Sequence, residues 1–462
     1  MDVDPTRTLA EHVSQTTFGD LPEPAMISSK LDILDTLGAA LGGSVAPGLA
    51  ELAALVTGWG GRGESSLLLL GGRVPAPQAA MVNAAMGHAL DFDDTFDRAG
   101  NIHPGTSTLF ASLALAERQD GVSGQELLLA VALGLDVSCR LALAATVDRG
   151  WHRTATLGIF GAAAAAGKLL HLDTEQMVHT FGIAYSQAAG NRQCILDGAL
   201  TKRLQAGQAA SSGVLAALLA QQGFTGARDV FAGRFGFYPM YQPEGYDLTA
   251  ITHDLGQAFR GAELSFKPYP CGRGNHAVLD VALELYEELD LATAQKGADI
   301  AEVVLTTNPQ TYNVEFGFNP AKRRPTQVVE AQFSLPFLVA TALALGRIGI
   351  ADVARVDNPA VLALIDRIQG EPQTDAAPGW ARLMVRRSDG RSASLETRQS
   401  ISGSPQRPLS QTQLEAKFRD CAANAVRPIP EAVVGQAIER VYSLDATDDA
   451  TILIRLFNQA TE

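Results

Sequence analysis

The chain is poor in aromatic side chains and in cysteine, and it has no excess of positive charge. Phe, Trp and Tyr make up 6% of the 462 residues, which favours close-packed helices over a cavity lined with aromatic rings. The four cysteines are widely spaced and form no CxxC pair, so neither a zinc knuckle nor a disulfide framework is expected. With a formal net charge of −14 and no long Lys/Arg run, the chain is a poor candidate for binding nucleic acid or an anionic membrane.

Long apolar runs and a secretory leader are missing as well. The longest apolar run, residues 158–167, is too short to span a bilayer and is mostly alanine. The first residues lack the basic-then-apolar pattern of a signal peptide. Hydrophobic residues (46%) and charged residues (19%) occur in ordinary globular proportions. We therefore expect a protein of the reducing cytoplasm that does not enter a membrane.

The first half of the chain has the apolar spacing of α-helices. Apolar residues recur at three- and four-residue intervals in residues 28–41 and 125–145. Two segments rich in alanine and other small residues, 156–170 and 207–222, have the composition of helices that approach one another closely. The pattern predicts a helical region over about residues 9–261.

The pattern changes after Phe266. Residues 300–307 alternate and are rich in β-branched side chains, which predicts a strand. Asp389-Gly390 separates two alternating runs, 381–387 and 392–400, and this arrangement predicts a β-hairpin. Two further segments of this part are predicted to be helical, 272–289 and 332–345.

Pro405 and Pro408 mark a second boundary, and residues 410–423 follow with a capped, amphipathic helical pattern. A chain of this length is expected to form two or three domains. We expect the last helices to return to the first domain. The predicted fold class is mainly α, with a large all-helical domain over 1–264 and 405–462 and a smaller α+β domain over 265–404.

Residues 83–105 hold most of the side chains that could do chemistry. Two histidines and three aspartates there could do chemistry or bind metal, and they are His88, Asp91, Asp93, Asp94 and His103, with Asp97 and Arg98 between them. Residues 93–97 form a DDxxD string, which on a helix would direct three carboxylates toward Mg²⁺ and a diphosphate. The alternative is a solvated helix end whose carboxylates act as caps. We find no second Mg²⁺ motif, and DDxxD alone does not decide between the two.

Four other short segments carry histidines or cations. They are the HPG turn at 103–105, GWHRTAT at 150–156, GALTKR at 198–203 and SFKPYPCGRGNH at 265–276. Each has a simpler structural interpretation: a turn, a helix cap beside a surface histidine, a solvated basic face and a proline-stiffened linker. The last segment lies where the two domains meet, which is a common position for a cleft.

Together these motifs resemble the MmgE/PrpD family. The segments that carry the resemblance are GHALDFDDTF (87–96), HPG (103–105), GWHRTATLGIFGAAAAAGKLL (150–170), TKRLQAGQAA (201–210), KPYPCGRGNH (267–276), AQFSLPF (331–337) and KFRDCA (417–422). Their order and spacing extend over nearly the whole chain. The family contains enzymes that dehydrate, decarboxylate or epimerise small polycarboxylic acids such as 2-methylcitrate, cis-aconitate and iminodisuccinate.

The resemblance implies a helical domain, a smaller α+β lid and an active site between them, in a homodimer that needs no metal and no organic cofactor. By similarity, the catalytic residues are Asp91, His103, His152, Lys202 and Lys267. Substrate binding is expected of Thr95, Arg273 and His276. One departure from the family pattern is Gln205, which occupies a position where histidine is common. Another is the missing Asp-Asn-Leu run after His103-Pro104 that is associated with methylcitrate dehydratases.

These reactions share a proton transfer at carbon next to a carboxylate, and cations must stabilise the charge that develops. In our hypothesis, His103 and His152 act as acid and base on opposite sides of the substrate. Lys202 and Lys267 bind its carboxylates. Asp91 holds one of the imidazoles in the required tautomer.

The sequence thus predicts a cofactor-independent lyase that acts on a small di- or tricarboxylic acid by decarboxylation or dehydration. An epimerase of an iminodisuccinate-like dicarboxylate is the alternative within the same family. Two alternatives of other classes are a Mg²⁺-dependent diphosphate enzyme built on DDxxD and a non-catalytic binding homologue. The expected partners are the polycarboxylate substrate and a second copy of the chain.

Overall fold

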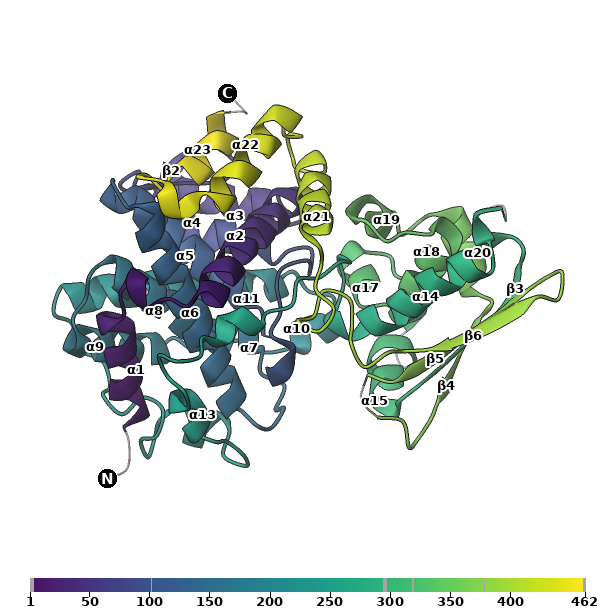
Figure 1. Cartoon of the computed structure of the whole chain (residues 1–462), viewed down its shortest axis with the longest axis horizontal. Coiled ribbons are helices and arrows are strands. Elements are labelled where there is room, and N and C mark those ends of the chain that lie inside the picture. Colours follow the sequence, from purple (N-terminus) through teal and green to yellow (C-terminus); the bar gives the residue numbers. More distant parts are fainter. Residues whose placement is uncertain (1–3, 101, 294–296, 318–319, 378, 460–462) are drawn as a thin grey trace.

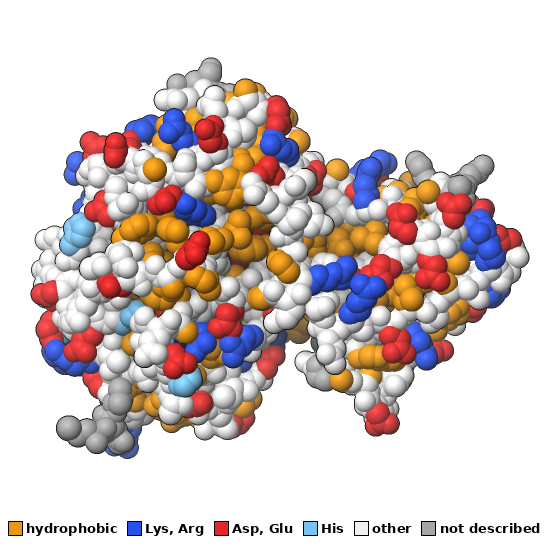
Figure 2. Space-filling model, in the orientation of Figure 1, with side chains coloured by type: hydrophobic (Ala, Val, Ile, Leu, Met, Phe, Trp, Pro, Cys, Tyr) orange, Lys and Arg blue, Asp and Glu red, His pale blue; other side chains and the backbone are white. Residues whose placement is uncertain are grey.

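The computed structural model describes residues 4–100, 102–293, 297–317, 320–377 and 379–459, which form two lobes of unequal size (Figure 1). The larger lobe is a stack of helices, and the smaller lobe carries a sheet. The mainly helical class predicted from the sequence is confirmed. Figure 2 shows the same two lobes in space-filling form, with a notch between them at the lower edge and charges of both signs interspersed on this face.

The first part of the larger lobe contains thirteen α-helical segments among the described residues. They are α1 (Pro5–Gln15), α2 (Glu23–Gly43), α3 (Leu49–Trp59), α4 (Ala76–Gly87), α5 (Pro104–Gln119), α6 (Gly124–Ala144), α7 (Arg153–Thr156), α8 (Gly158–Leu169), α9 (Thr174–Tyr185), α10 (Gln193–Leu196), α11 (Thr201–Gln221), α12 (Phe237–Tyr241) and α13 (Thr249–Thr252).

The helices at the centre of this lobe touch through small residues. Helix α8 packs against α5, α6 and α11, and α11 also packs against α4. At Gly161 of α8, an added Cβ would lie 2.0 Å from Ser138 Oγ and 2.5 Å from the Gly134 carbonyl oxygen of α6. At Gly213 of α11, an added Cβ would lie 2.5 Å from the Ala162 Cβ of α8. Glycine therefore permits the close approach of three core helices.

The region predicted to be helical contains two exceptions. A short antiparallel pair, β1 (Ser65–Ser66) and β2 (Arg73–Val74), lies beside α4. Between α11 and residue 266, the only helices among the described residues are α12, α13 and the 3₁₀ turn η3 (Arg260–Glu263). Periodicity did not reveal these features because they are shorter than the repeat that it measures.

The smaller lobe is built on a four-stranded mixed sheet with the order β4-β3-β5-β6. The strands are β3 (Ile300–Thr307), β4 (Ile368–Pro372), β5 (Ala381–Arg387) and β6 (Ser392–Glu396). The predicted hairpin is present, although β6 ends earlier than expected. Strand β4 pairs in parallel with β3 and was not predicted, because its sequence IQGEP has no apolar alternation and lies at the sheet edge.

Helices cover this sheet and connect it to the larger lobe. The main ones are α14 (His276–Glu288) and α18 (Leu335–Leu345), which pack on each other. The shorter segments are η4 (Arg273–Asn275), η5 (Leu291–Thr293), α15 (Pro309–Thr311), the π-helical turn η7 (Tyr312–Gly317), α16 (Pro320–Arg323), α17 (Val328–Gln332), α19 (Ile350–Ala354) and α20 (Pro359–Ile365). Helix α15 and the turn η7 supply part of the surface that faces the larger lobe.

The chain returns to the larger lobe after the sheet. Helices α21 (Gln411–Ala423), α22 (Glu431–Tyr442) and α23 (Ile452–Gln459) follow, and α21 packs along α2 (Figure 1). Apolar side chains of 414–457 join the hydrophobic core that contains residues 9–266, whereas residues 271–385 form a separate core. The predicted limits of the domains, at 264/265 and 404/405, stay predictions, but the two cores are distinct.

Helix α6 is long and apolar enough to cross a membrane by composition alone. In the folded chain, 94% of its most apolar 18-residue window is buried inside the protein. Helices α5, α8 and α13 pack against it. Its apolar character therefore serves the core of the larger lobe.

Candidate active site

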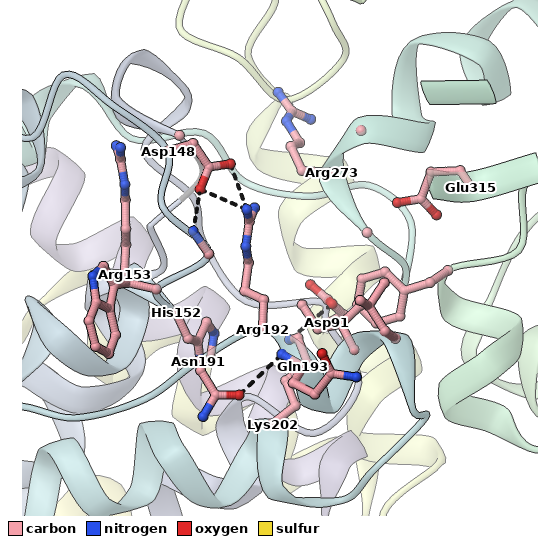
Figure 3. A pocket seen from close by; sticks show the side chains of 18 of the residues that line it. Asp91, Asp148, His152, Arg153, Asn191, Arg192, Gln193, Lys202, Arg273 and Glu315 are labelled. Carbon is pink, nitrogen blue, oxygen red and sulfur yellow. Dashed lines mark hydrogen bonds and ion pairs between the residues drawn. The ribbon is translucent and has the colours of Figure 1, made fainter. Parts of the chain in front are cut away.

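A cavity of about 740 Å³ lies between the two lobes and receives side chains from both. Asp91, His103, His152 and Lys202 line it from the larger lobe. From the smaller lobe, which we call the lid, come Arg273, Glu315 and Phe333. Figure 3 shows these two walls facing each other. The volume is in the range of pockets for small molecules.

Asp91 lies in a strained turn after α4. Its φ angle is +53°, in the left-handed region that non-glycine residues rarely adopt. Strain of this kind persists where the surrounding contacts enforce it, and it is common at functional sites. Here the turn brings the carboxylate between two ammonium groups from distant parts of the chain.

Those two groups belong to Lys202 and Lys267. Lys202 Nζ lies 3.0 Å from Asp91 Oδ2. Lys267 Nζ forms an ion pair with Asp91 Oδ1 and donates a hydrogen bond of 3.0 Å to the Asp91 carbonyl oxygen. Burial raises the pKa of the Asp91 carboxyl, but the two lysines together lower that pKa well below its usual range. Asp91 is therefore a fixed anion that holds two cations in place.

This arrangement corrects the role expected for Asp91. We had predicted that its carboxylate orients one of the imidazoles, but its hydrogen bonds and ion pairs involve the two lysines. Other groups orient the imidazoles. The reason is the turn at residue 91, which directs the carboxylate toward α11 and residue 267 instead of toward His103.

His88 completes a buried network that the sequence analysis did not include in the site. Its Nε2 atom lies 2.8 Å from Lys202 Nζ and accepts from that ammonium, which leaves Nδ1–H to donate to Asp93 Oδ2 at 2.7 Å. Thr106 Oγ1 donates to the same Asp93 oxygen at 2.9 Å. The series Asp93, His88, Lys202 thus fixes the position of the Lys202 ammonium. The sequence offered one indication that His88 belongs to the site, namely its position three residues before Asp91.

His103 stands at the N-cap of α5, where Pro104 begins the helix with a preset backbone angle. Its Nδ1 atom lies 2.5 Å from the Asp94 carbonyl oxygen, and its backbone N–H donates to Thr154 Oγ1. The carbonyl can only accept, so Nδ1 carries the proton and Nε2 is the basic nitrogen. Burial and the nearby Lys267 lower the pKa of His103 to about 3.

His152 is held in a comparable way on the neighbouring wall. Its Nδ1 atom lies 2.9 Å from Gln205 Oε1, and the Gln205 amide donates to the Asn191 carbonyl oxygen. Burial, with His88 and Lys202, lowers the pKa of His152 well below its usual value. The His88 ring lies beside both others, with centroids 5.2 Å from His103 and 5.4 Å from His152. Gln205 therefore orients the His152 imidazole.

Three predicted site residues lie behind the cavity surface. Lys267 is fully buried beneath Asp91. Thr95 is fully buried and pairs through its backbone with Ser265. His276 is fully buried as well, with Nε2 3.2 Å from the Cys271 carbonyl oxygen. In this structure none of the three lines the cavity, so direct substrate contact is not the role that their positions favour.

Arg273 lines the cavity and also links the lobes. Its guanidinium forms hydrogen bonds with Asp97, one of them at 2.7 Å, and donates to the Ser402 carbonyl oxygen at 2.9 Å. Farther toward the larger lobe, Arg192 binds Asp148 in the same cavity lining (Figure 3). The walls thus carry several cations, a composition that suits a polyanionic ligand.

The DDxxD interpretation is wrong for this fold. Residues 91–96 are not helical, so the three carboxylates do not share a helix face. Asp93 accepts from His88 and Thr106, and Asp94 Oδ1 accepts from the Gly105 backbone N–H. Asp97 binds Arg273. Each carboxylate thus serves a different contact within the protein, and the geometry expected for a bridged Mg²⁺ and diphosphate is not formed.

Comparison with known proteins agrees with this picture. The model of the MmgE/PrpD N-terminal domain matches residues 7–248, and that of the C-terminal domain matches residues 269–442. The chain belongs to the MmgE/PrpD family. The C-terminal family match continues through α21 and α22, the helices that pack on the larger lobe.

Several similar proteins carry the name cis-aconitate decarboxylase. The human one is 28% identical over 98% of this chain and 94% of its own length. The mouse one is 30% identical over 83% of this chain and 79% of its own length. The one from Aspergillus terreus is 25% identical over 98% of this chain and 96% of its own length. The similarity therefore extends across both lobes.

Proposed function

We propose that this protein is a lyase that decarboxylates a small unsaturated tricarboxylate of the cis-aconitate type. The observation that carries the proposal is the pair His103 and His152, two oriented neutral imidazoles that face one cavity with the Lys202–Asp91 ion pair. The names of the similar proteins support the choice of substrate class. We further propose that the reaction needs no metal and no organic cofactor.

The proposed chemistry uses the cations of the cavity wall. When a carboxylate leaves as CO₂, the electron pair of the broken C–C bond forms a new C=C bond, and the pair of the original C=C bond passes to the carbon next to a second carboxylate. That carbon and its carboxylate share the new charge, which a fixed cation stabilises without reorganisation. Lys202 is held for this purpose by Asp91 and His88. Arg273, on the facing wall, is suited to bind another carboxylate of the substrate.

The two histidines would exchange protons with the substrate or its leaving groups. Their low pKa values make both imidazoles neutral in the free protein, with Nε2 as the basic nitrogen. A bound polyanion raises the pKa of a nearby imidazole because opposite charge favours the protonated form. Among the described residues, neither Nε2 has a protein hydrogen bond that would compete with substrate.

Parallel incubations in D₂O test the proposal. The purified protein is mixed with cis-aconitate, 2-methylcitrate or iminodisuccinate, and each reaction is followed by NMR with and without EDTA. We expect CO₂ loss from cis-aconitate, one deuterium in the product and no effect of EDTA. Loss of water from 2-methylcitrate would indicate a dehydratase. Exchange of a proton for deuterium in iminodisuccinate, with inversion at that carbon, would indicate an epimerase. The proposal would be contradicted if the protein turned over none of the three substrates.

Two further parts of the proposal concern the state of the protein in the cell. We propose that it works as a homodimer in the cytoplasm. Sedimentation at micromolar concentration tests the first part, since a monomer would contradict it. Fractionation of cells that produce the protein tests the second.

A further inference from the structure

Glu315 is an acidic side chain on the lid wall of a cavity whose other acidic lining residues, Asp91 and Asp148, form ion pairs with cations. It lies in the π-helical turn η7 and lines the cavity opposite Asp91 and Lys202 (Figure 3). A carboxyl group at this place is unexpected in a site for a polyanion, because two negative charges repel each other. None of the sequence motifs included it.

The Glu315 carboxyl has a free oxygen. Although the side chain as a whole is partly exposed, its Oε2 atom is buried and has no hydrogen-bond partner among the described residues. Lys322, a lid cation whose charge acts on Glu315, donates its hydrogen bond to the Phe333 carbonyl oxygen at 2.8 Å. Buried polar atoms without a partner are rare and costly, and at a cavity wall they point to a ligand or to a proton.

The proposed decarboxylation consumes one proton, and in the free protein the histidines and the lysine on the wall of the larger lobe hold no uncommitted proton for it. His103 and His152 are neutral in the free protein and use their Nδ1–H groups to bind Asp94 and Gln205. Lys202 holds its protons between Asp91 and His88. If that ammonium gave up a proton, Asp91 would lose one of its two counter-charges.

We propose that Glu315 is the acid that delivers this proton to the substrate from the lid side. The inference rests on the proposed function, because it names the donor for that reaction. It assigns Glu315 a catalytic role, with direct contact between its carboxyl group and the reacting carbon.

The step balances as follows. The C–C bond to the departing carboxylate breaks, CO₂ leaves, and its electron pair forms a new C=C bond. The original C=C bond breaks at the same time, and its electron pair moves to the carbon next to another carboxylate. A new C–H bond forms there with the proton of the Glu315 carboxyl, whose O–H bond breaks and leaves a carboxylate. Water that reaches the partly exposed side chain returns the proton before the next turnover.

The protonation state of Glu315 agrees with this role. Burial raises its pKa to about 7, although Lys322 and the Asn275 side chain oppose the rise, and the negative charge of Asp91 adds to it. A trianion in the cavity favours the protonated form further. General acids work best when their pKa lies near the working pH.

The test compares wild type with Glu315→Gln, which keeps the shape and loses the acid. We expect kcat to fall by about 100-fold or more, in the range for a lost general acid, while KM changes little. In wild type, kcat should decline as pH rises above the pKa of Glu315, and that decline should be missing in the variant. Glu315→Asp, a shorter acid, should retain the pH dependence at a lower rate.

Glu371→Gln is the matched control, since Glu371 is an exposed residue on strand β4 of the same lobe. It should match wild type in kcat and in pH profile. If wild type turns over cis-aconitate and Glu315→Gln does so within about threefold of wild type, the inference is overturned and the proposed function stands. If wild type turns over no polycarboxylate, the proposed function fails and the inference fails with it.

Discussion

The two walls of the cavity differ in how their charged side chains are partnered. The wall of the larger lobe is a buried network in which Asp91, Lys202 and His88 satisfy one another. The lid wall holds Glu315 with an unpartnered oxygen, on short helical segments around η7. A network of fixed charges can stabilise developing negative charge without reorganisation, whereas an unpaired acid can give its proton away.

The comparison indicates a division of labour between the lobes. The core helices position the Asp91–Lys202–His88 network, whose charge must not change during the reaction. The lid contributes the group whose charge must change. Substitutions in the buried Asp91–Lys202–His88 network should therefore affect both stability and rate, whereas substitutions of cavity-lining groups outside it, on either lobe, should affect mainly rate.

Asp91→Asn should have the largest effect, because it removes the anion from between two lysines. We expect kcat to fall about 10³-fold, since the Lys202 ammonium loses its fixed position. The free energy of unfolding should fall by about 3–5 kcal/mol, because the buried Lys267 loses its closest charge partner and keeps only Asp93, 3.9 Å away. Activity assays and urea unfolding measure the two effects. Asp366→Asn, at an exposed ion pair with Arg324, is the control and should change neither.

The same substitution changes the pH dependence of stability. The folded-state pKa of Asp91 lies well below its ordinary 3.8, so its contribution is present above that pH and is lost as the pH falls further. Wild type should therefore lose more stability than Asp91→Asn on acidification below about pH 4. Parallel loss in both proteins would show that the ion pair does not stabilise the wall.

His103→Gln should reduce kcat by about 10²–10³-fold with little loss of stability. Glutamine fills a similar space but has no basic ring nitrogen. Stopped assays with the natural substrate class measure the rate, and His171→Gln, at a highly exposed histidine, serves as the control. A variant with near-wild-type turnover would remove His103 from the mechanism and leave the lid acid as the main proton-transfer group.

Lys417→Met tests whether helix α21 helps to hold the buried network around Asp91 in place. Lys417 Nζ donates to Asp35 Oδ1 and to the Phe92 carbonyl oxygen, both at 2.6 Å, next to the strained turn. Loss of these contacts should cost about 2 kcal/mol of unfolding free energy and lower kcat modestly. Arg419→Met, at an exposed ion pair of the same helix, should cost less than about 1 kcal/mol. An equal loss of unfolding free energy in both variants would show that the contacts of Lys417 give no specific support to the network.

Gln205→Leu should have the smallest effect on the larger-lobe wall. The His152 Nδ1–H group would lose its acceptor, and the ring could adopt the other tautomer. We expect kcat to fall about tenfold without a change in the unfolding midpoint. Gln208→Leu, one turn away and exposed on α11, is the control. A tenfold loss in both variants would point to a general disturbance of the helix.

Much of the fold was predictable because it depends on local pattern. The apolar spacing of α2 and α6 and the Asp-Gly turn between β5 and β6 each specify one element with little help from the rest of the chain. Strand β4 depends on a parallel partner far away in the sequence, and such pairing leaves no local pattern to recognise.

The sequence predicted which residues form the site better than it predicted how their side chains are oriented. Motif resemblance grouped the residues, and the structure brings Asp91, His103, His152 and Lys202 to one cavity. The direction of each side chain depended on backbone features that sequence patterns do not reveal, such as the left-handed turn at Asp91. Glu315 was missed because a single glutamate in an irregular turn resembles any surface acid.

The most direct test of the two-wall account is the stereochemical position of deuterium in the product formed from cis-aconitate in D₂O, read by NMR in the presence of a chiral solvating agent. If a placed acid on the lid delivers the proton to one face of the bound intermediate, the product carries one deuterium in a single stereochemical position. The Glu315→Gln variant should then form product much more slowly. Equal deuterium in both positions with wild type would contradict the account, because it would mean that solvent protonates an intermediate that neither wall holds.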